Sequence, residues 1–231
     1  MEGDMDGSFG KLMVLSPHLD DAVFSCGALL AAQPGTVVVT AFAGAPSGGV
    51  VLAEWDATAG FDAPRQAIAA RREEDRQALQ CVQATPHWLD FCDSQYGPTP
   101  WEADLAAAFD DVVRQYRPDT VLMPAGLFHS DHALAHRAAL RVRRKYAGSN
   151  WLMYEEAFYR RIPGLLQRRL AVLLDAGLHA TPLAYDTSGH VEAKRAATAF
   201  YASQLRALAS AGRPGHVDLD APERYWQLTQ I

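Results

Sequence analysis

Short apolar runs alternate along this chain with longer amphipathic stretches. Runs of β-branched and other apolar residues predict buried strands over 11–15, 36–42, 87–91, 120–124 and 151–154. Apolar positions at helical spacing predict helices over 64–82, 101–116, 133–146 and 192–208. Strands that alternate with helices are typical of βαβ units around a parallel sheet. The pattern therefore predicts an α/β fold with a mainly parallel central sheet.

Three segments fall outside this alternation. Residues 44–60 contain several Gly, Pro and Ser residues, which predicts a long loop, and such loops often border the site of a parallel-sheet protein. Residues 160–181 have no clear period, and the tail from 212 onward is interpreted as a loop or a docking arm. We expect residues 1–10 to be a flexible N-terminal segment and 11–231 to form a single domain, since no internal repeat or linker interrupts them.

Composition narrows the classes of function. Apolar residues make up 49% of the 231 residues and charged residues 21%, the balance of a folded globular protein. A net charge of −6 argues against a nucleic-acid partner, because the one dense basic stretch, 141–145, is interpreted as a solvated helix end. No apolar run reaches the roughly 18 residues that span a bilayer, and no signal peptide is visible. With three cysteines, an odd number, we expect a cytoplasmic protein.

A first chemical cluster, Pro17-His18-Leu19-Asp20-Asp21, directly follows the first predicted strand. Sites in open parallel sheets form at the carboxyl ends of the strands. If a helix begins near Asp20, the side chains of His18 and Asp21 turn toward one point, while Asp20 faces another direction. One carboxylate can then bind a metal while its neighbour stays free.

A second cluster, His129-Ser130-Asp131-His132, follows the strand over 120–124. Imidazole and carboxylate ligands suit zinc, and three protein ligands plus water are usual for a catalytic zinc site. His18, Asp21 and His132 supply that number. His129 and Asp131 are left over for proton transfer and for orienting other groups.

Simpler interpretations compete with the metal site. Asp20 or Asp21 could be a helix N-cap, and His129 and His132 could be loop residues. A nucleotide-binding domain is disfavoured, because the turn after the first strand lacks Gly-x-Gly-x-x-Gly and carries two Asp residues that would repel a pyrophosphate. A non-catalytic binding domain is also weighed, but binding alone would need neither Asp20 nor His129.

The two clusters resemble the signatures of one enzyme family. Residues 17–21 resemble the His-Pro-Asp-Asp motif, and residues 129–132 the His-x-Asp-His motif, of the LmbE-like/PIG-L N-acetylglucosaminyl deacetylases. Further matches lie, in the family's order, at 71–74, 154–156, Lys194 and 203–204, so the resemblance runs from about residue 11 to 208. It implies a Rossmann-like three-layer fold and a Zn²⁺ cofactor. Leu19 and the pair Gly27-Ala28 depart from the usual Pro and Gly-Gly.

The resemblance also implies roles for individual residues. His18, Asp21 and His132 would be the zinc ligands and Asp20 the general base. His129 would be a cationic partner that steadies the oxyanion or protonates the leaving amine, and Asp131 would orient His129. Arg71 would contact the substrate.

The function expected from these roles is hydrolysis of an N-acyl group, most simply N-acetyl, on an amino-sugar-containing small molecule of secondary-metabolite or thiol-cofactor biosynthesis. Zinc and a carboxylate base can activate water for attack on an amide carbon. A non-sugar amide or a thiol conjugate is the alternative substrate. The sequence does not choose between these substrates and leaves open whether the chain forms a homo-oligomer.

Overall fold

The computed structural model describes residues 9–230. Its centre is a seven-stranded sheet in the order β3-β2-β1-β4-β5-β7-β6. The strands are β1 (Leu12–Ser16), β2 (Val37–Thr40), β3 (Thr85–Trp88), β4 (Thr120–Pro124), β5 (Asn150–Tyr154), β6 (Leu178–Leu183) and β7 (Tyr225–Gln230). The first five are parallel, while β7 runs antiparallel to both β5 and β6. The predicted α/β fold with a mainly parallel sheet is confirmed.

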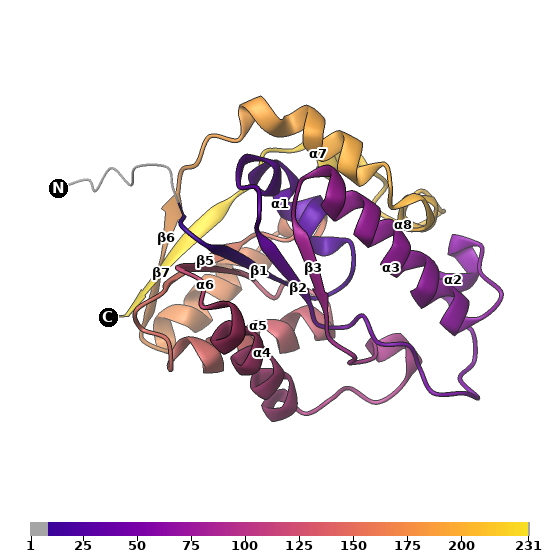
Figure 1. Ribbon diagram of the computed structural model, residues 1–231, viewed down its shortest axis with the longest axis horizontal. Coiled ribbons are helices and arrows are strands. Elements are labelled where there is room, and N and C mark those ends of the chain that lie inside the picture. The colour runs from indigo at the N-terminus through magenta and orange to yellow at the C-terminus, as the bar shows by residue number, and fades with distance from the viewer. Residues whose placement is uncertain (1–8, 231) are drawn as a thin grey trace.

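Helices cover both faces of the sheet, which makes three layers (Figure 1). In Figure 1, α1 (Asp21–Ala32), α3 (Pro64–Cys81) and α7 (Val191–Thr198) lie on one side, and α4 (Glu102–Tyr116), α5 (Ser130–Arg143) and α6 (Leu165–Asp175) on the other. The short helices α2 (Glu54–Ala59) and α8 (Ala202–Leu208) pack on each other. None of the helices within residues 9–230 is long and apolar enough to cross a membrane.

Alternate residues of each central strand enter different cores. Met13 and Leu15 of β1 belong to the cluster beneath α4 and α5, whereas Leu12 and Val14 belong to the cluster beneath α1 and α3. Side chains of a strand alternate between faces, and burial on both faces explains the continuous apolar runs in the sequence. The core therefore fixes the register of β1 and, with it, the position of the loop that follows.

The chain changes direction between β1 and β4. It leaves β1 toward β2 and β3 on one side and returns to β4 on the other. Such a switch point leaves a crevice at the carboxyl ends of the two strands, where ligands bind in open α/β sheets. Both predicted chemical clusters follow these two strands.

Several predicted boundaries were wrong. The loop predicted over 44–60 contains α2; β3 covers 85–88 rather than 87–91; α5 begins at Ser130 rather than 133; and the helix predicted over 192–208 is broken into α7 and α8. The tail predicted as loop or arm contains β7, which is inserted between β5 and β6. Residues 160–181, left without assignment, contain α6 and the start of β6.

The predicted flexible segment 1–10 lies mostly outside the described residues. Phe9, inside that range, is buried in the core, and its carbonyl oxygen accepts a hydrogen bond from Thr120 Oγ1 at 2.8 Å. The single domain over 11–231 stays a prediction.

Candidate active site

The site forms where β1 and β4 end side by side. Ser16, the last residue of β1, shapes the first loop: its hydroxyl donates to the carbonyl oxygen of His18 at 2.7 Å and accepts from Ala22 N–H at 3.1 Å. α1 then begins at Asp21. After β4, His129 occupies the N-cap position of α5, so Asp131 and His132 lie in the first helical turn.

Three predicted ligands converge at this point. Asp21 Oδ2 lies 3.2 Å from His18 Nδ1 and 3.1 Å from His132 Nε2, and the two ring nitrogens are 3.3 Å apart. The backbone N–H of His18 also donates to Asp21 Oδ2 at 2.9 Å. All three ligand atoms lie within 4.8 Å of one another, close enough for one ion to bind them together. Two imidazoles and a carboxylate are a donor set that suits zinc.

The electrostatics of this group favour a cation. Burial lowers the pKa of His132, but the Asp21 and Glu156 carboxylates together outweigh it and raise that pKa to about 9. Burial likewise opposes the charged form of Asp21, yet His132 and His18 hold the pKa of Asp21 well below its usual range. The ionised Asp21 carboxylate thus lies beside positively charged histidines. A metal ion can replace the protons that give these histidines their charge.

Glu156 orients His132. Glu156 Oε1 lies 3.3 Å from His132 Nδ1 and accepts hydrogen bonds from the N–H groups of Gly126 at 2.6 Å and Leu127 at 2.9 Å. A histidine whose Nδ1–H faces a carboxylate presents Nε2 as a ligand, and such partners fix both tautomer and ring orientation. The sequence left open whether Glu156 helps to line the pocket or is only a strand-end carboxylate. The signal for its role was its position just after β5, which pairs with β4.

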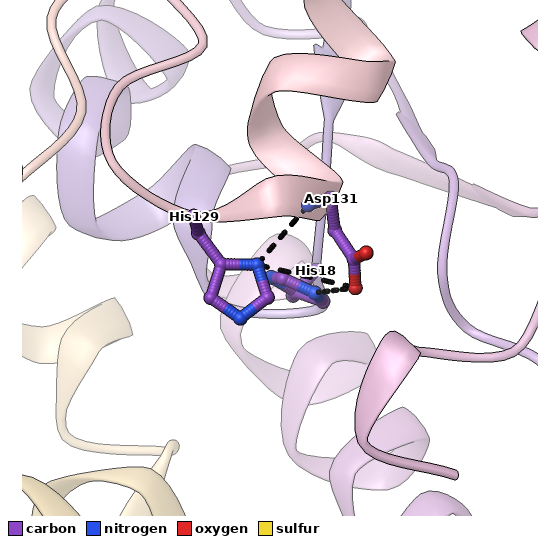
Figure 2. A group of neighbouring side chains, drawn as sticks. All are labelled: His18, His129 and Asp131. Atoms are coloured by element: carbon purple, nitrogen blue, oxygen red, sulfur yellow. Dashed lines mark hydrogen bonds and ion pairs between the residues drawn. The ribbon is translucent and has the colours of Figure 1, made fainter. Parts of the chain in front are cut away.

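A second group contains His18, His129 and Asp131 (Figure 2). Asp131 Oδ2 lies 3.2 Å from His18 Nε2 but 4.0 Å from His129 Nδ1, and it accepts a hydrogen bond from Ser94 N–H at 3.0 Å. Burial would raise the pKa of Asp131, but His18, with the Ser94 N–H and His129, outweighs it and lowers that pKa to about 2. The carboxylate predicted to orient His129 therefore faces His18 more closely.

His129 is oriented instead by a backbone group. Its Nδ1 accepts a hydrogen bond from Asp131 N–H at 3.2 Å, which leaves Nε2 to carry the proton of the neutral ring. Burial, followed by the rings of His18 and His132, lowers the pKa of His129. The expected cationic form is thus disfavoured, although the neutral ring still offers an Nε2–H donor.

Asp20 occupies the N-cap position of α1, but its side chain makes no capping hydrogen bond within the described residues. The simple N-cap interpretation therefore does not account for it. Burial, and then the adjacent Asp21 carboxylate, raise the pKa of Asp20 to about 7. Its carboxyl group lines the same cavity as the three ligands.

Arg71 lines this cavity from α3 but is already paired. Its Nη2 donates to Asp56 Oδ1 at 2.5 Å and its Nη1 to Tyr96 OH at 3.3 Å, while Tyr96 OH donates to Asp56 Oδ2 at 2.7 Å. Asp56 is fully buried in α2, inside the predicted loop. The structure thus gives Arg71 a buried ion pair, and a substrate contact would add to it.

The cavity has a volume of about 570 Å³. Besides the predicted residues, it is lined by an acidic and amide pair, Asp93 and Gln95, and by many aromatic side chains. Asp93 Oδ2 lies 3.6 Å from His18 Nε2. Sequence reasoning missed Asp93, which follows β3, although the same strand-end argument that found His18 applies to it. A cavity of this size is ordinary for a small-molecule site.

Comparison with known proteins places these features in one family. Residues 13–143 match the family model PIG-L, described as GlcNAc-PI de-N-acetylase. In Streptomyces fradiae, 2'-N-acetylparomamine deacetylase is 28% identical over 173 residues, which cover 65% of this chain and 58% of that protein. The chain therefore matches less than two thirds of this relative's length.

Two solved structures share the fold over nearly the whole chain. A triple mutant of a deacetylase involved in the teicoplanin biosynthetic pathway has a TM-score of 0.82 at 25% identity, and the match covers 96% of this chain and 98% of that one. The zinc-inhibited form of teicoplanin deacetylase has a TM-score of 0.81 at 23% identity with the same coverage. The matched range 13–143 is more than half of the chain and includes both chemical clusters. The chain belongs to the PIG-L family.

Proposed function

We propose that this chain is a zinc-dependent N-deacetylase that removes an acetyl group from the amine of an amino-sugar-containing small molecule. The observation that carries the proposal is the convergence of His18 Nδ1, Asp21 Oδ2 and His132 Nε2 within 4.8 Å, beside Asp20 in one cavity. Three ligands with an adjacent base are what metal-assisted amide hydrolysis requires.

The comparisons support the substrate class. The Streptomyces fradiae relative is a deacetylase of 2'-N-acetylparomamine, and the solved relatives are deacetylases of the teicoplanin pathway. Both names denote a deacetylase, of an N-acetylated compound in the first case and within the teicoplanin biosynthetic pathway in the second. We therefore favour an N-acetylated amino sugar over a non-sugar amide or a thiol conjugate.

A bound zinc ion would polarise the amide carbonyl and favour deprotonation of water at neutral pH. Asp20, whose carboxylate is not engaged in capping α1, accepts the proton of the attacking water. His129 donates from Nε2–H to the amide oxygen as negative charge develops there, because Asp131 N–H occupies its Nδ1. The proton held by Asp20 then passes to the departing amine. Water plus amide thus gives acetate plus a free amine.

The test is release of products from a panel of N-acetylated amino sugars. The chain is stripped with a chelator and reloaded with zinc from zero to one equivalent, because a relative of this fold has been solved in a zinc-inhibited form. Acetate and primary amine should appear in equal amounts, only in the reloaded protein, and Asp20→Asn serves as the matched control. Hydrolysis of non-sugar amides alone would contradict the proposed amino-sugar substrate. Hydrolysis by the metal-free protein would contradict the proposed zinc dependence.

A further inference from the structure

Two phenylalanines of the cavity wall sit in unusual backbone conformations. Phe128 has φ 59°, and His129 N–H donates to Leu127 C=O at 2.7 Å across it. Phe158 has φ 68° and ψ −50°, and Tyr159 N–H donates to Ala157 C=O at 2.8 Å. Both are γ-turns with positive φ at the central residue, a rare and strained form. They follow the neighbouring strands β4 and β5.

Glycine would relieve the strain at these positions, and the chain uses glycine nearby. Gly126, two residues before Phe128, has φ +74°, and a Cβ there would lie 2.5 Å from His136 Cβ. Phe128, by contrast, keeps a large side chain in the left-handed region, where bulky residues are outliers. Strain of this kind persists where surrounding contacts enforce it and often marks a functional site.

Packing accounts for only part of the Phe128 side chain, because 70% of the residue is exposed. One face of its ring stacks on Tyr159, with the centroids 5.4 Å apart and the planes inclined by 30°. Tyr159 in turn meets the proposed ligand His132 edge to face, with centroids 5.1 Å apart. The exposed ring thus stands at the cavity, two rings away from the reacting centre.

The part of the wall that follows β4 and β5 is apolar apart from its histidines and the hydroxyl of Tyr159. It contributes Phe128, Phe158, Tyr159 and Ile162, whereas the acidic and amide pair, Asp93 and Gln95, comes from the segment after β3. Hydroxyl-rich groups would find hydrogen-bond partners near Asp93 and Gln95, but not along Phe128 and Ile162. A flat apolar group would instead bury surface against the exposed Phe128 ring.

We propose that Phe128 is a specificity-determining residue that stacks on an aromatic group carried by the substrate beside its N-acetylated sugar. The proposal rests on the proposed function and narrows it to a glycoside with an aromatic aglycone. The γ-turn holds the Phe128 ring in place before the substrate arrives, so that little conformational freedom is lost on binding.

The test compares the phenyl and methyl glycosides of N-acetylglucosamine as substrates of the zinc-loaded protein. Wild-type kcat/KM should be about tenfold higher for the phenyl glycoside, mainly through KM, which is the size expected for one aromatic stacking contact with its burial. Phe128→Ala should bring the ratio close to one, and Phe128→Tyr should restore it. If Phe128 were needed only for folding, its substitution would lower kcat/KM for both glycosides together and leave the ratio of the two unchanged.

Trp101→Ala is the matched control, because Trp101 is 81% exposed and does not line the cavity, so its ratio should equal that of wild type. An unchanged ratio in Phe128→Ala, or a wild-type ratio of one or less, overturns the proposal. If neither glycoside is hydrolysed, the proposed function is decided by the panel of N-acetylated amino sugars. The role of Phe128 is then tested separately by calorimetric titration with the phenyl and methyl glycosides of glucosamine. Equal binding of the two by wild type would then overturn the role of Phe128.

Discussion

Lys194 Nζ lies 2.9 Å from Glu223 Oε1, and both side chains are buried at the middle of α1. The Glu223 carboxylate also accepts the backbone N–H groups of Ala28 at 2.9 Å and Leu29 at 3.0 Å, where α1 is kinked at Cys26. A Cβ at residue 27 would meet Lys194 Cγ at 2.8 Å, which explains Gly27. This pair ties the end of the chain to the helix that begins at Asp21.

Lys194→Met should destabilise the fold strongly, because it leaves the Glu223 carboxylate buried without its cation. Breaking one side of a buried ion pair costs about 3–5 kcal/mol. The double variant Lys194→Met/Glu223→Gln should recover part of that loss in denaturant unfolding. Arg195→Met, the neighbouring exposed cation, should have little effect. Equal stability of the two single variants would contradict the importance of the buried pair.

Metal binding should depend on three side chains directly and on a fourth indirectly. His18→Ala, Asp21→Ala and His132→Ala should each lose zinc, since each removes one of three converging ligands. Glu156→Gln should retain the site but weaken zinc affinity by about 10–100-fold, because it loosens the orientation of His132. Elemental analysis and competition with a chromogenic chelator measure both effects. Full occupancy in all three alanine variants would refute the ligand assignment.

How far the sequence predicts this molecule depends on where the determining contacts lie. The strand over 120–124 is an apolar run buried on both faces, and the structure places β4 over the same residues. The start of α5 was missed because its cap is the His129 ring, which accepts Asp131 N–H where a short polar side chain is usual. The pattern over 192–208 is continuous, yet the chain breaks near Tyr201, whose OH donates to Asp75 Oδ1 at 2.8 Å.

The residues of the site likewise divide into those that the local sequence pattern predicts and those that depend on contacts in the folded chain. The convergence of His18, Asp21 and His132 was predictable because each cluster follows its own buried strand, and the two strands are neighbours. The ion-pair partner of Arg71 was not predictable, because Asp56 lies in a segment predicted as loop and meets α3 only in the folded chain. Likewise β7 reaches its place between β5 and β6 from the far end of the sequence, which no local pattern indicates.

Asp20→Asn should keep the metal and lose most turnover. The amide preserves the shape of the side chain but cannot accept the proton of water, and loss of a general base costs about 10²–10⁴-fold in kcat. His129→Ala should also retain zinc while lowering kcat, because its Nε2–H donor is removed. Steady-state kinetics beside metal analysis of the same samples separates the two effects. Asp20→Asn with near-normal activity would assign the base to another group.

Arg71 allows its structural and substrate roles to be separated. Arg71→Met leaves Asp56 buried without its cation, so we expect a lower unfolding temperature. The double variant Arg71→Met/Asp56→Asn should regain stability because no unpaired charge remains. If Arg71 also contacts the substrate, KM in this stable double variant should stay raised. A return of KM to the wild-type value would assign Arg71 to the ion pair alone.

His136 should make the stability of the fold depend on pH. Its Nδ1–H donates to Pro124 C=O at 2.8 Å, and its Nε2 is buried without a hydrogen-bond partner among the described residues. Burial, together with the charge of Arg169, lowers the pKa of His136 to about 3. Between that value and the ordinary pKa of 6.5, the unfolded chain binds a proton that the folded chain does not.

The unfolding free energy should therefore decrease as pH falls below about 6.5, by about 2 kcal/mol between pH 8 and pH 5 from this group alone. Other groups titrate in the same range, so the comparison is with His136→Asn, which keeps a donor near Pro124 C=O but has no proton to gain. The variant should be less stable at pH 8, because ring volume is lost, yet show a shallower decline toward pH 5 in urea unfolding. Parallel curves for the two proteins would mean that His136 is protonated as readily in the fold as in the unfolded chain.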